Sequence, residues 1–139
     1  MGGVMGGVEI ALDTAPRSVP LARRWLADVL GPASRYDADV ARLLLSEVVT
    51  SAMLQARTGL VVRVEDSGTR LRVEVTTVGS PSDTRPTRAS PATGQHVVEL
   101  LAAGWGTQRE AGRGGTTTWF ELLPVTARPG DRLQHDVGA

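Results

Sequence analysis

Hydrophobic and polar positions recur at regular intervals along most of the chain, and the interval changes from one stretch to the next. The stretch from Val8 to Leu12 alternates enough between apolar and polar residues to predict a short strand. From Ser18 onward the apolar positions recur at helical spacing, with Pro20 in the first turn, until Gly31 stops the pattern. We therefore expect a helix that has Ser18 as its N-cap and ends at Gly31.

A second helical pattern begins at Asp37 or Asp39, runs to about Arg57 and is expected to end at Gly59. When each residue is advanced by about 100° around the axis, apolar side chains cover most of the circumference. One flank combines apolar and polar side chains: Val40, Leu43, Leu44, Leu54, Glu47 and Ser51. We expect this helix to be buried over most of its surface.

Two strands are predicted after this helix. The stretches 60–66 and 71–78 carry the two-residue period of strands, and Asp66-Ser67-Gly68-Thr69 supplies the turn between them. One face of the second strand is apolar and consists of Leu71, Val73 and Val75, and its other face consists of Arg72, Glu74 and Thr76. This alternation predicts that the first of the two faces packs against the core.

Residues 79–93 form a loop rich in Ser, Pro and Thr, and a loop of about fifteen residues is usually functional or disordered. A third helix is predicted over 94–103. Its inward-facing residues are expected to be Val97, Leu100 and Leu101. Two further strands, near 105–109 and over 116–123, are joined by a glycine-rich turn.

The order of these elements predicts the α+β class: a two-layer sandwich of a mainly antiparallel sheet with about three helices on one face. Trp105 and Trp119 are expected in its core rather than in contact with a ligand. Residues 1–7 and 125–139 lack comparable patterns, so the domain is expected to span 8–124 between flexible ends.

Composition narrows the chemistry. The chain has 139 residues, 15 basic residues that are all arginine, 15 acidic residues and no cysteine. These counts exclude a catalytic lysine, a lysine Schiff base, cysteine nucleophiles and zinc–thiolate sites. The formal net charge of zero disfavours nucleic-acid binding, which usually needs a basic face. No stretch has the pattern of a signal peptide or a membrane span, so a soluble, cytoplasmic protein is expected.

Glu47 stands out because a carboxylate on an apolar flank is costly unless it is hydrogen-bonded, paired or facing a cleft. A structural interpretation is that Glu47 caps a backbone group or pairs with an arginine such as Arg63 or Arg72. A functional interpretation is that it serves as a catalytic base. Composition alone favours the structural interpretation, because ion pairs also occupy such positions.

Five segments, in order, carry a resemblance to a known family. They are PRSVPLARRWLADVL, SEVVTSAMLQA, LRVEVTTVGSP, GQHVVELLAAGWG and GGTTTWFEL. Together they cover roughly residues 11–123, and they resemble the GHKL ATPases, within them the small bacterial anti-sigma-factor serine kinases. The resemblance implies a Bergerat-type fold, Mg·ATP as cofactor, phosphorylation of a serine, a sigma factor or an anti-sigma antagonist as partner, and homodimerisation.

In the second segment the family pattern has a glutamate that acts as general base and, four residues later, an asparagine that holds magnesium. The matching residues are Glu47 and Ser51, one helical turn apart and therefore on one face. A hydroxyl can ligate magnesium, but it is a weaker hard-oxygen donor than the amide carbonyl. Ser51 is thus a weakened magnesium position.

The resemblance places three further positions of the nucleotide site. Thr77 stands where the family has an aspartate that accepts hydrogen bonds from adenine, two residues before Gly79. Gly94 and His96 match a G-x-G whose backbone amides approach the phosphates, and His96 adds bulk where glycine is expected. The simplest interpretation of His96 is a surface residue in the first turn of a helix.

Two other residues complete the comparison with the family pattern. Thr117, in the closing strand, is either a pocket-lining residue or a residue with high strand propensity. Asp66 also begins an Asp-x-Gly triplet, but it lies in the predicted turn between two strands, so we assign it to turn formation.

Three functions remain open. The first is a regulatory protein that binds a sigma factor or an anti-sigma antagonist without transferring phosphate and without a cofactor. The second is an active Mg·ATP-dependent serine kinase that holds magnesium through Ser51 and water. The third is a receptor for a small ligand other than adenine, bound by Thr77 and His96. The changes at three positions of the nucleotide site favour the first, a pseudo-enzyme that keeps Glu47 as the remnant of a base.

Overall fold

The computed structural model describes residues 7–56, 58–78, 92–110 and 115–125. The elements are, in order, β1 (Val8–Leu12), α1 (Ser18–Leu30), α2 (Ala38–Met53), β2 (Gly59–Asp66), β3 (Leu71–Val78), α3 (Ala92–Leu101), β4 (Gly104–Glu110) and β5 (Gly115–Leu122). None of the described helices is long and apolar enough to cross a membrane. All eight elements were expected from the sequence, with shifts at several of their ends.

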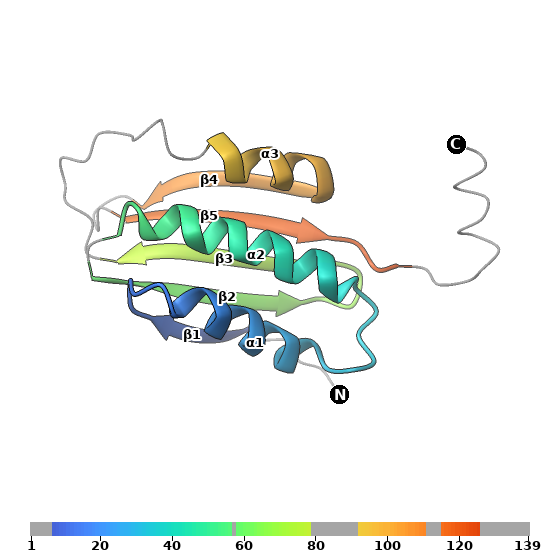
Figure 1. Cartoon of the computed structure of the whole chain (residues 1–139). Coiled ribbons are helices and arrows are strands. Elements are labelled where there is room, and N and C mark those ends of the chain that lie inside the picture. The colour runs from blue at the N-terminus through green and yellow to red at the C-terminus, as the bar shows by residue number, and fades with distance from the viewer. Residues whose placement is uncertain (1–6, 57, 79–91, 111–114, 126–139) are drawn as a thin grey trace.

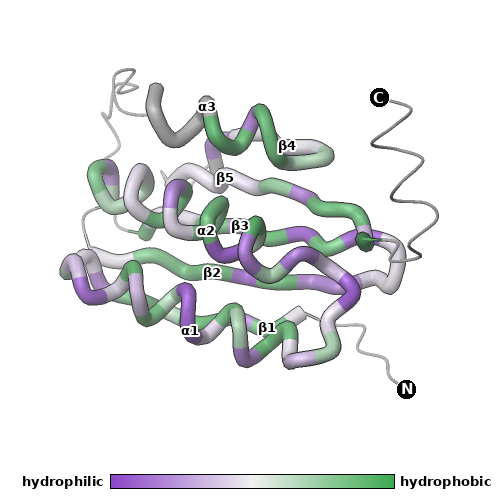
Figure 2. The backbone as a smooth tube through the Cα atoms, turned by 45° about the vertical axis from the view of Figure 1, so that its right-hand side comes forward, coloured by the Kyte–Doolittle hydropathy of each residue, from purple (hydrophilic) through white to green (hydrophobic). Residues whose placement is uncertain are grey.

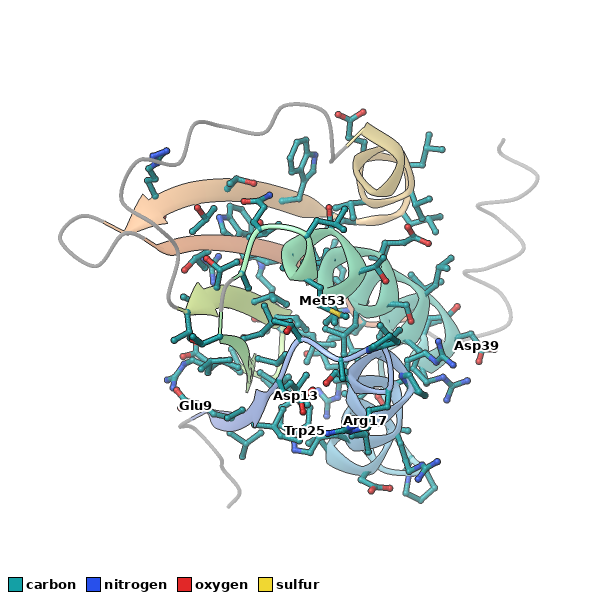
Figure 3. All side chains as sticks on the ribbon, turned by 60° about the vertical axis from the view of Figure 1, so that its left-hand side comes forward. Glu9, Asp13, Arg17, Trp25, Asp39 and Met53 are labelled. Atoms are coloured by element: carbon teal, nitrogen blue, oxygen red, sulfur yellow. The ribbon has the colours of Figure 1, made fainter. Side chains whose placement is uncertain are left out.

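The strands form one sheet in the order β1-β2-β3-β5-β4, and every neighbouring pair is antiparallel. The three helices lie side by side on one face of this sheet, with α2 between α1 and α3 (Figure 1). The opposite face, where Glu9 lies, carries no helix in the described part of the chain (Figure 3). This arrangement confirms the predicted α+β class and the two-layer sandwich.

The core lies between the helices and the sheet. The alternation in β3 is as predicted, with Leu71, Val73 and Val75 buried and their neighbours partly exposed. Phe120 of β5 is fully buried opposite Val73, and α2 packs against both strands. Hydrophobic positions recur along the helices and along β2, β3 and β5 (Figure 2). Burial of these side chains at roughly 25 cal/mol per Å² is the main force that joins the two layers.

The first helix starts differently from the prediction. Arg17 occupies the N-cap position without a capping side-chain bond, and Ser18 is the first helical residue. Ser18 Oγ lies 2.9 Å from both the carbonyl oxygen and Oδ1 of Asp13, so it ties the helix back to the end of β1. The backbone N–H of Ala15 and the Ser18 hydroxyl hold the pKa of Asp13 below its usual value. Ser18 as N-cap is therefore wrong, because its hydroxyl is used in this contact.

The second helix starts as expected and ends early. Asp37 is the N-cap, and its side chain accepts hydrogen bonds from the backbone N–H groups of Asp39 and Val40. The helix ends at Met53 rather than near residue 57, because the chain must turn to enter β2. Gly59 is the first residue of β2, and a Cβ there would lie 2.8 Å from the carbonyl oxygen of Leu12.

Burial of the helices is less complete than predicted. In α2 the buried residues are Ala41, Leu44, Leu45, Val48, Val49 and Ala52. Leu43 and Leu54, however, are 43% and 70% exposed. In α3 Val98 is buried, whereas Leu100 and Leu101, predicted to face inward, are 77% and 43% exposed. Val98 lies at the centre of the side of α3 that faces the core. Leu100 is about 160° from Val98 around the helix axis.

Candidate functional site

The topology brings the sequence-predicted site to one end of the sandwich. Residues after α2 lead into Gly59, which pairs with Val78 at the end of β3, and β5 starts beside that same end through the pair Thr76–Thr117. α3 leads into Gly104, which pairs with Glu121 at the opposite end of the sheet. α3 therefore starts at the end where β3 finishes (Figure 1). At this end of the sandwich α2 and β3 finish, and α3 and β5 start. We call it the Thr77 end.

Glu47 and Ser51 lie on the flank of α2 that faces α3. Ser46, on the other flank, accepts a hydrogen bond from Arg23 of α1 at 3.3 Å. Because Glu47 and Ser51 are one turn apart and on the opposite flank, they point to the α3 side, and both are half-buried. Within the described part of the chain Glu47 has no hydrogen bond or ion pair.

The structural interpretation of Glu47 as the partner of an arginine is wrong for both arginines that were considered. Arg63 pairs with Glu9 and Glu65, at 3.0 and 2.8 Å. These two carboxylates raise the pKa of the Arg63 guanidinium, with the hydrogen bond to Glu65 as the larger cause. Glu9 lies on the helix-free face of the sheet (Figure 3), and its pairing in register with Arg63 places Arg63 on the same face, away from α2.

Arg72 belongs to a second charged group on the same helix-free face. It pairs with Glu74 at 2.8 Å and with Glu121 at 3.0 Å. Its guanidinium also lies 4.2 Å from the centroid of the Trp119 ring, a cation–π contact. Gly106 of β4 gives the ring room, since a Cβ there would lie 2.8 Å from it. The assignment of Trp119 to the core is therefore wrong, whereas Trp105 packs against the core as predicted.

Thr77 lies on the helix-covered face at the end of β3, and it is 4% exposed. Its Oγ1 accepts a hydrogen bond from the backbone N–H of Thr116 at 2.9 Å. The backbones of β3 and β5 approach each other closely here: a Cβ added at Gly115 would lie 2.5 Å from the carbonyl oxygen of Thr77. The Thr77 hydroxyl thus joins β3 to the start of β5.

Thr117 does not face Glu47. Its Oγ1 lies 2.7 Å from Oγ1 of Thr76, its partner in register, and paired residues of antiparallel strands point to the same face. Thr76 is on the helix-free face because Thr77 is on the other. The interpretation of Thr117 as a residue that lines a site with Glu47 is therefore wrong, and the alternative of a strand-forming residue fits.

The remaining predicted site residues are placed only in part. Gly94 and His96 lie in the N-terminal half of α3, at the Thr77 end, and their side-chain surroundings fall outside the described residues. Gly79 and the rest of the predicted loop up to residue 91 also fall outside them. Ala92 and Thr93, predicted in the loop, begin α3.

Two observations on the described residues bear on the Mg·ATP site that the resemblance implies. The end of β3 presents a buried, hydrogen-bonded hydroxyl where a carboxylate would have to accept from adenine. Among the described residues no group of three or more His, Asp or Glu side chains could hold a metal ion. Glu47 is half-buried on the α3 side of α2 and makes no bond to another residue in the described part of the chain.

Asp66 is in the turn, as assigned from the sequence. Its Oδ1 accepts hydrogen bonds from the N–H of Gly68 and from the hydroxyl of Tyr36, both at 2.8 Å. Sequence reasoning did not single out Tyr36, although it is the only tyrosine in the chain and immediately precedes a helix N-cap. This bond, at the end of the sandwich opposite Thr77, confirms that Asp66 is structural.

The sequence matches no model of a known protein family, and it has no significant match among curated proteins.

Proposed function

We propose that this chain is a Bergerat-type domain related to the anti-sigma-factor serine kinases that has lost Mg·ATP binding and acts by binding a protein partner. The observation that carries the proposal is the Thr77 hydroxyl, which is buried and bonded to the N–H of Thr116. Support for the relationship comes from the order of the elements and from the meeting of α2, β3 and α3 at one end. The partner class and homodimerisation follow from the resemblance, and the cytoplasmic location follows from the absence of a signal-peptide or membrane-span pattern in the sequence.

The loss of nucleotide affinity follows from the number of altered positions. Ser51 replaces an amide, Thr77 a carboxylate and His96 a glycine, relative to the family pattern. A buried donor or acceptor that is left unpaired costs about 1–3 kcal/mol. A combined loss of about 4 kcal/mol already weakens binding about a thousandfold. The adenine position is the most severely altered, because the replacing hydroxyl is already bonded within the sheet.

Calorimetry with Mg·ATP and Mg·ADP tests this proposal on the native chain and on a Ser51→Asn/Thr77→Asp/His96→Gly variant. We expect no heat of binding from the native chain at millimolar nucleotide and measurable binding by the variant. The carboxylate that Thr77→Asp introduces can still accept from the N–H of Thr116, and a thermal unfolding curve checks that the variant is folded. Micromolar binding of either nucleotide by the native chain would show that the proposal is wrong.

A second candidate function, an active serine kinase, is favoured by one observation. Glu47 is half-buried, unpaired within the described residues and directed to the α3 side, as a general base would be. The test is phosphate transfer from radiolabelled ATP to an anti-sigma antagonist protein. Transfer that is lost in Glu47→Ala would establish the kinase and exclude the pseudo-enzyme.

A further inference from the structure

β4 is an edge strand of the sheet. In the described part of the chain it pairs with β5 alone, so its outer side presents backbone N–H and C=O groups without a partner strand. Thr107, Gln108 and Arg109 are exposed, and the strand contains no proline. An open edge of this kind can pair with another strand unless its side chains prevent it. The side chains of β4 therefore decide what can pair with it.

Alternate side chains of β4 lie on the helix-covered face of the sheet. Trp105 is in register with Phe120, which is fully buried between the layers, so Trp105 is on that face. Thr107 and Arg109 share the face, because side chains two residues apart in a strand point the same way. Trp105 packs against the core, whereas Arg109 is exposed and has no ion pair among the described residues. This face of β4 thus carries, in order, an aromatic ring, a threonine and a cation.

The order of these side chains is self-complementary in one antiparallel register. When Thr107 of two copies stand opposite each other, Trp105 of each copy stands opposite Arg109 of the other, and no two like charges face each other. Side chains at opposed positions of antiparallel strands are roughly 5 Å apart, which allows a cation–π contact. The same sheet already contains such a contact, because the Arg72 guanidinium lies 4.2 Å from the centroid of the Trp119 ring.

The last turn of α3 adds a carboxylate at the same place. α3 and β4 run in opposite directions and are joined by a short connection, so Glu99 lies over the start of the strand, near Trp105 (Figure 1). In α3 Val98 is buried and Val97 packs against the core, whereas Glu99 is exposed. Glu99 and Val97 are each about 100° from Val98, in opposite directions, so Glu99 is on the flank away from α2. An arginine opposite Trp105 would therefore also lie beside Glu99.

We infer that β4 binds β4 of a second copy of this chain, antiparallel and with Thr107 at the two-fold axis, so that the two sheets become one. Each Arg109 then lies against Trp105 and Glu99 of the other copy. Such a contact is isologous, because the same strand serves both partners. Homodimerisation is part of the proposed function, on which the inference rests for the presence of a second copy, and the inference assigns the contact to the β4 edge.

Two alternatives fit the described residues less well. Arg109 could serve to prevent pairing, as charged residues on edge strands commonly do, but this requires that like charges meet. In the register centred on Thr107 they do not. The opposite edge, β1, has five residues against seven in β4, and its Glu9 is already paired with Arg63 at 3.0 Å. One pair of strands buries less than the standard interface of about 800 Å² per partner, so we expect a dissociation constant in the micromolar range.

The test is sedimentation equilibrium of the full chain, from micromolar to millimolar concentration, with charge-swapped variants. Arg109→Glu places a carboxylate opposite Glu99 and should weaken dimerisation about tenfold or more. Glu99→Arg should weaken it as well, and the double variant Arg109→Glu/Glu99→Arg should recover much of the loss, because the ion pair is restored with its signs exchanged. Arg24→Glu on α1 is the matched control, since Arg24 is exposed and lacks an ion pair in the described ranges. It changes the net charge equally and should leave dimerisation as it is.

Amide hydrogen exchange locates the contact. The N–H groups on the outer side of β4 should become protected as the concentration rises, whereas those of β1 should not change. Thermal unfolding followed by circular dichroism checks that each variant is folded. The inference is overturned by a chain that stays monomeric at millimolar concentration, by equal losses in Arg109→Glu and Arg24→Glu, or by protection at β1 in place of β4. Stronger association of Arg109→Ala would also overturn it, because Arg109 would then prevent pairing.

These outcomes can be told apart from a failure of the proposed function. A dimer without protection at β4 would overturn the assignment to this edge and leave homodimerisation in place. Calorimetry with Mg·ATP tests the loss of nucleotide binding, and its result does not depend on which strand joins the two copies. Nucleotide binding by a dimer that is protected at β4 would contradict the proposed function and support the inference.

Discussion

The two ends of the sandwich use their polar residues in opposite ways. At the end where α2 starts, the polar groups of the connecting segments bond to one another and hold three parts of the chain together. At the Thr77 end, Thr77 is bonded within the sheet, and Glu47 has no partner in the described part of the chain. The described polar groups of the first end that are named below bond within the fold, whereas Glu47, on the α3 side of α2, bonds to no other described residue.

The end opposite Thr77 is joined by a short series of hydrogen bonds. Tyr36, which is 4% exposed, donates to Asp66 at the turn between β2 and β3. Arg35 donates from its guanidinium to the carbonyl of Gly68, and its own carbonyl accepts from the N–H of Val125 at 2.7 Å. The segment before α2 therefore binds both the central turn and the chain that follows β5.

The contrast lies in what each polar group contributes to the fold. Thr77 is bonded within the sheet, so freeing its hydroxyl would require a new partner for the N–H of Thr116. Glu47, by contrast, costs little where it is, because it is half-buried and no other described group depends on it. Buried polar groups require partners, whereas half-exposed ones can remain without a structural role.

The largest effect is expected at the structural end. Tyr36→Ala removes a buried aromatic ring and leaves Asp66 without one donor, so we expect a loss of about 3 kcal/mol or more in the free energy of unfolding. Tyr36→Phe keeps the ring and should cost about 1 kcal/mol. Urea unfolding measures both. Equal stability of the alanine variant and the native chain would contradict the structural role of this end.

Alkaline pH should weaken the same end. Burial, and then the hydrogen bond to Asp66, raise the pKa of Tyr36 from 10.0 to about 12. The unfolded chain therefore loses this proton first, and the stabilisation present below pH 10 is lost as the pH rises toward 12. The free energy of unfolding is expected to fall by an amount on the order of 2 kcal/mol. Because the chain has one tyrosine, tyrosinate absorbance at about 295 nm follows the titration directly, and an ordinary pKa would refute this expectation.

A smaller effect is expected at Thr77. Thr77→Val keeps the shape of the side chain and leaves the N–H of Thr116 without its acceptor, so it should cost about 1–2 kcal/mol. Thr77→Ser keeps the hydroxyl and is the matched control, with a smaller loss. Hydrogen exchange at the Thr116 amide should accelerate in the valine variant alone. Unchanged exchange there would mean that the bond contributes nothing.

The smallest effect is expected at Glu47. Glu47→Gln removes the charge of a group that has no partner in the described residues, so the free energy of unfolding should change by about 0.5 kcal/mol or less. Thermal unfolding of the variant beside the native chain measures this difference. A destabilisation of about 2 kcal/mol would reveal a structural partner for Glu47 and remove the contrast between the two ends.

Much of the fold follows from the period of the apolar residues. The strict alternation of Leu71, Val73 and Val75 predicts both the strand and its buried face. The predicted end of α2 was wrong because the helical spacing of apolar residues continues to Ala56. The turn into β2 is set instead by the contact between Gly59 and Leu12. The pattern of apolar residues within one helix cannot predict an end that is set by contact with another strand.

The candidate site was predictable in position but not in orientation. The four-residue spacing of Glu47 and Ser51 indicated that they share a flank of α2, and the structure has both residues in that helix. The face on which Thr117 lies depends on its register with Thr76, and the bond made by Thr77 depends on the approach of Gly115. Both are tertiary features that no spacing along the chain records.

The most direct measurement of the central claim is an NMR titration of the native chain with Mg·ATP, followed by backbone amide shifts up to millimolar nucleotide. We predict that the amides of Ser51, Thr77 and Thr116 do not shift and that the Thr116 amide stays protected. Saturable shifts at these three positions, with release of the Thr116 amide from Thr77, would contradict the account.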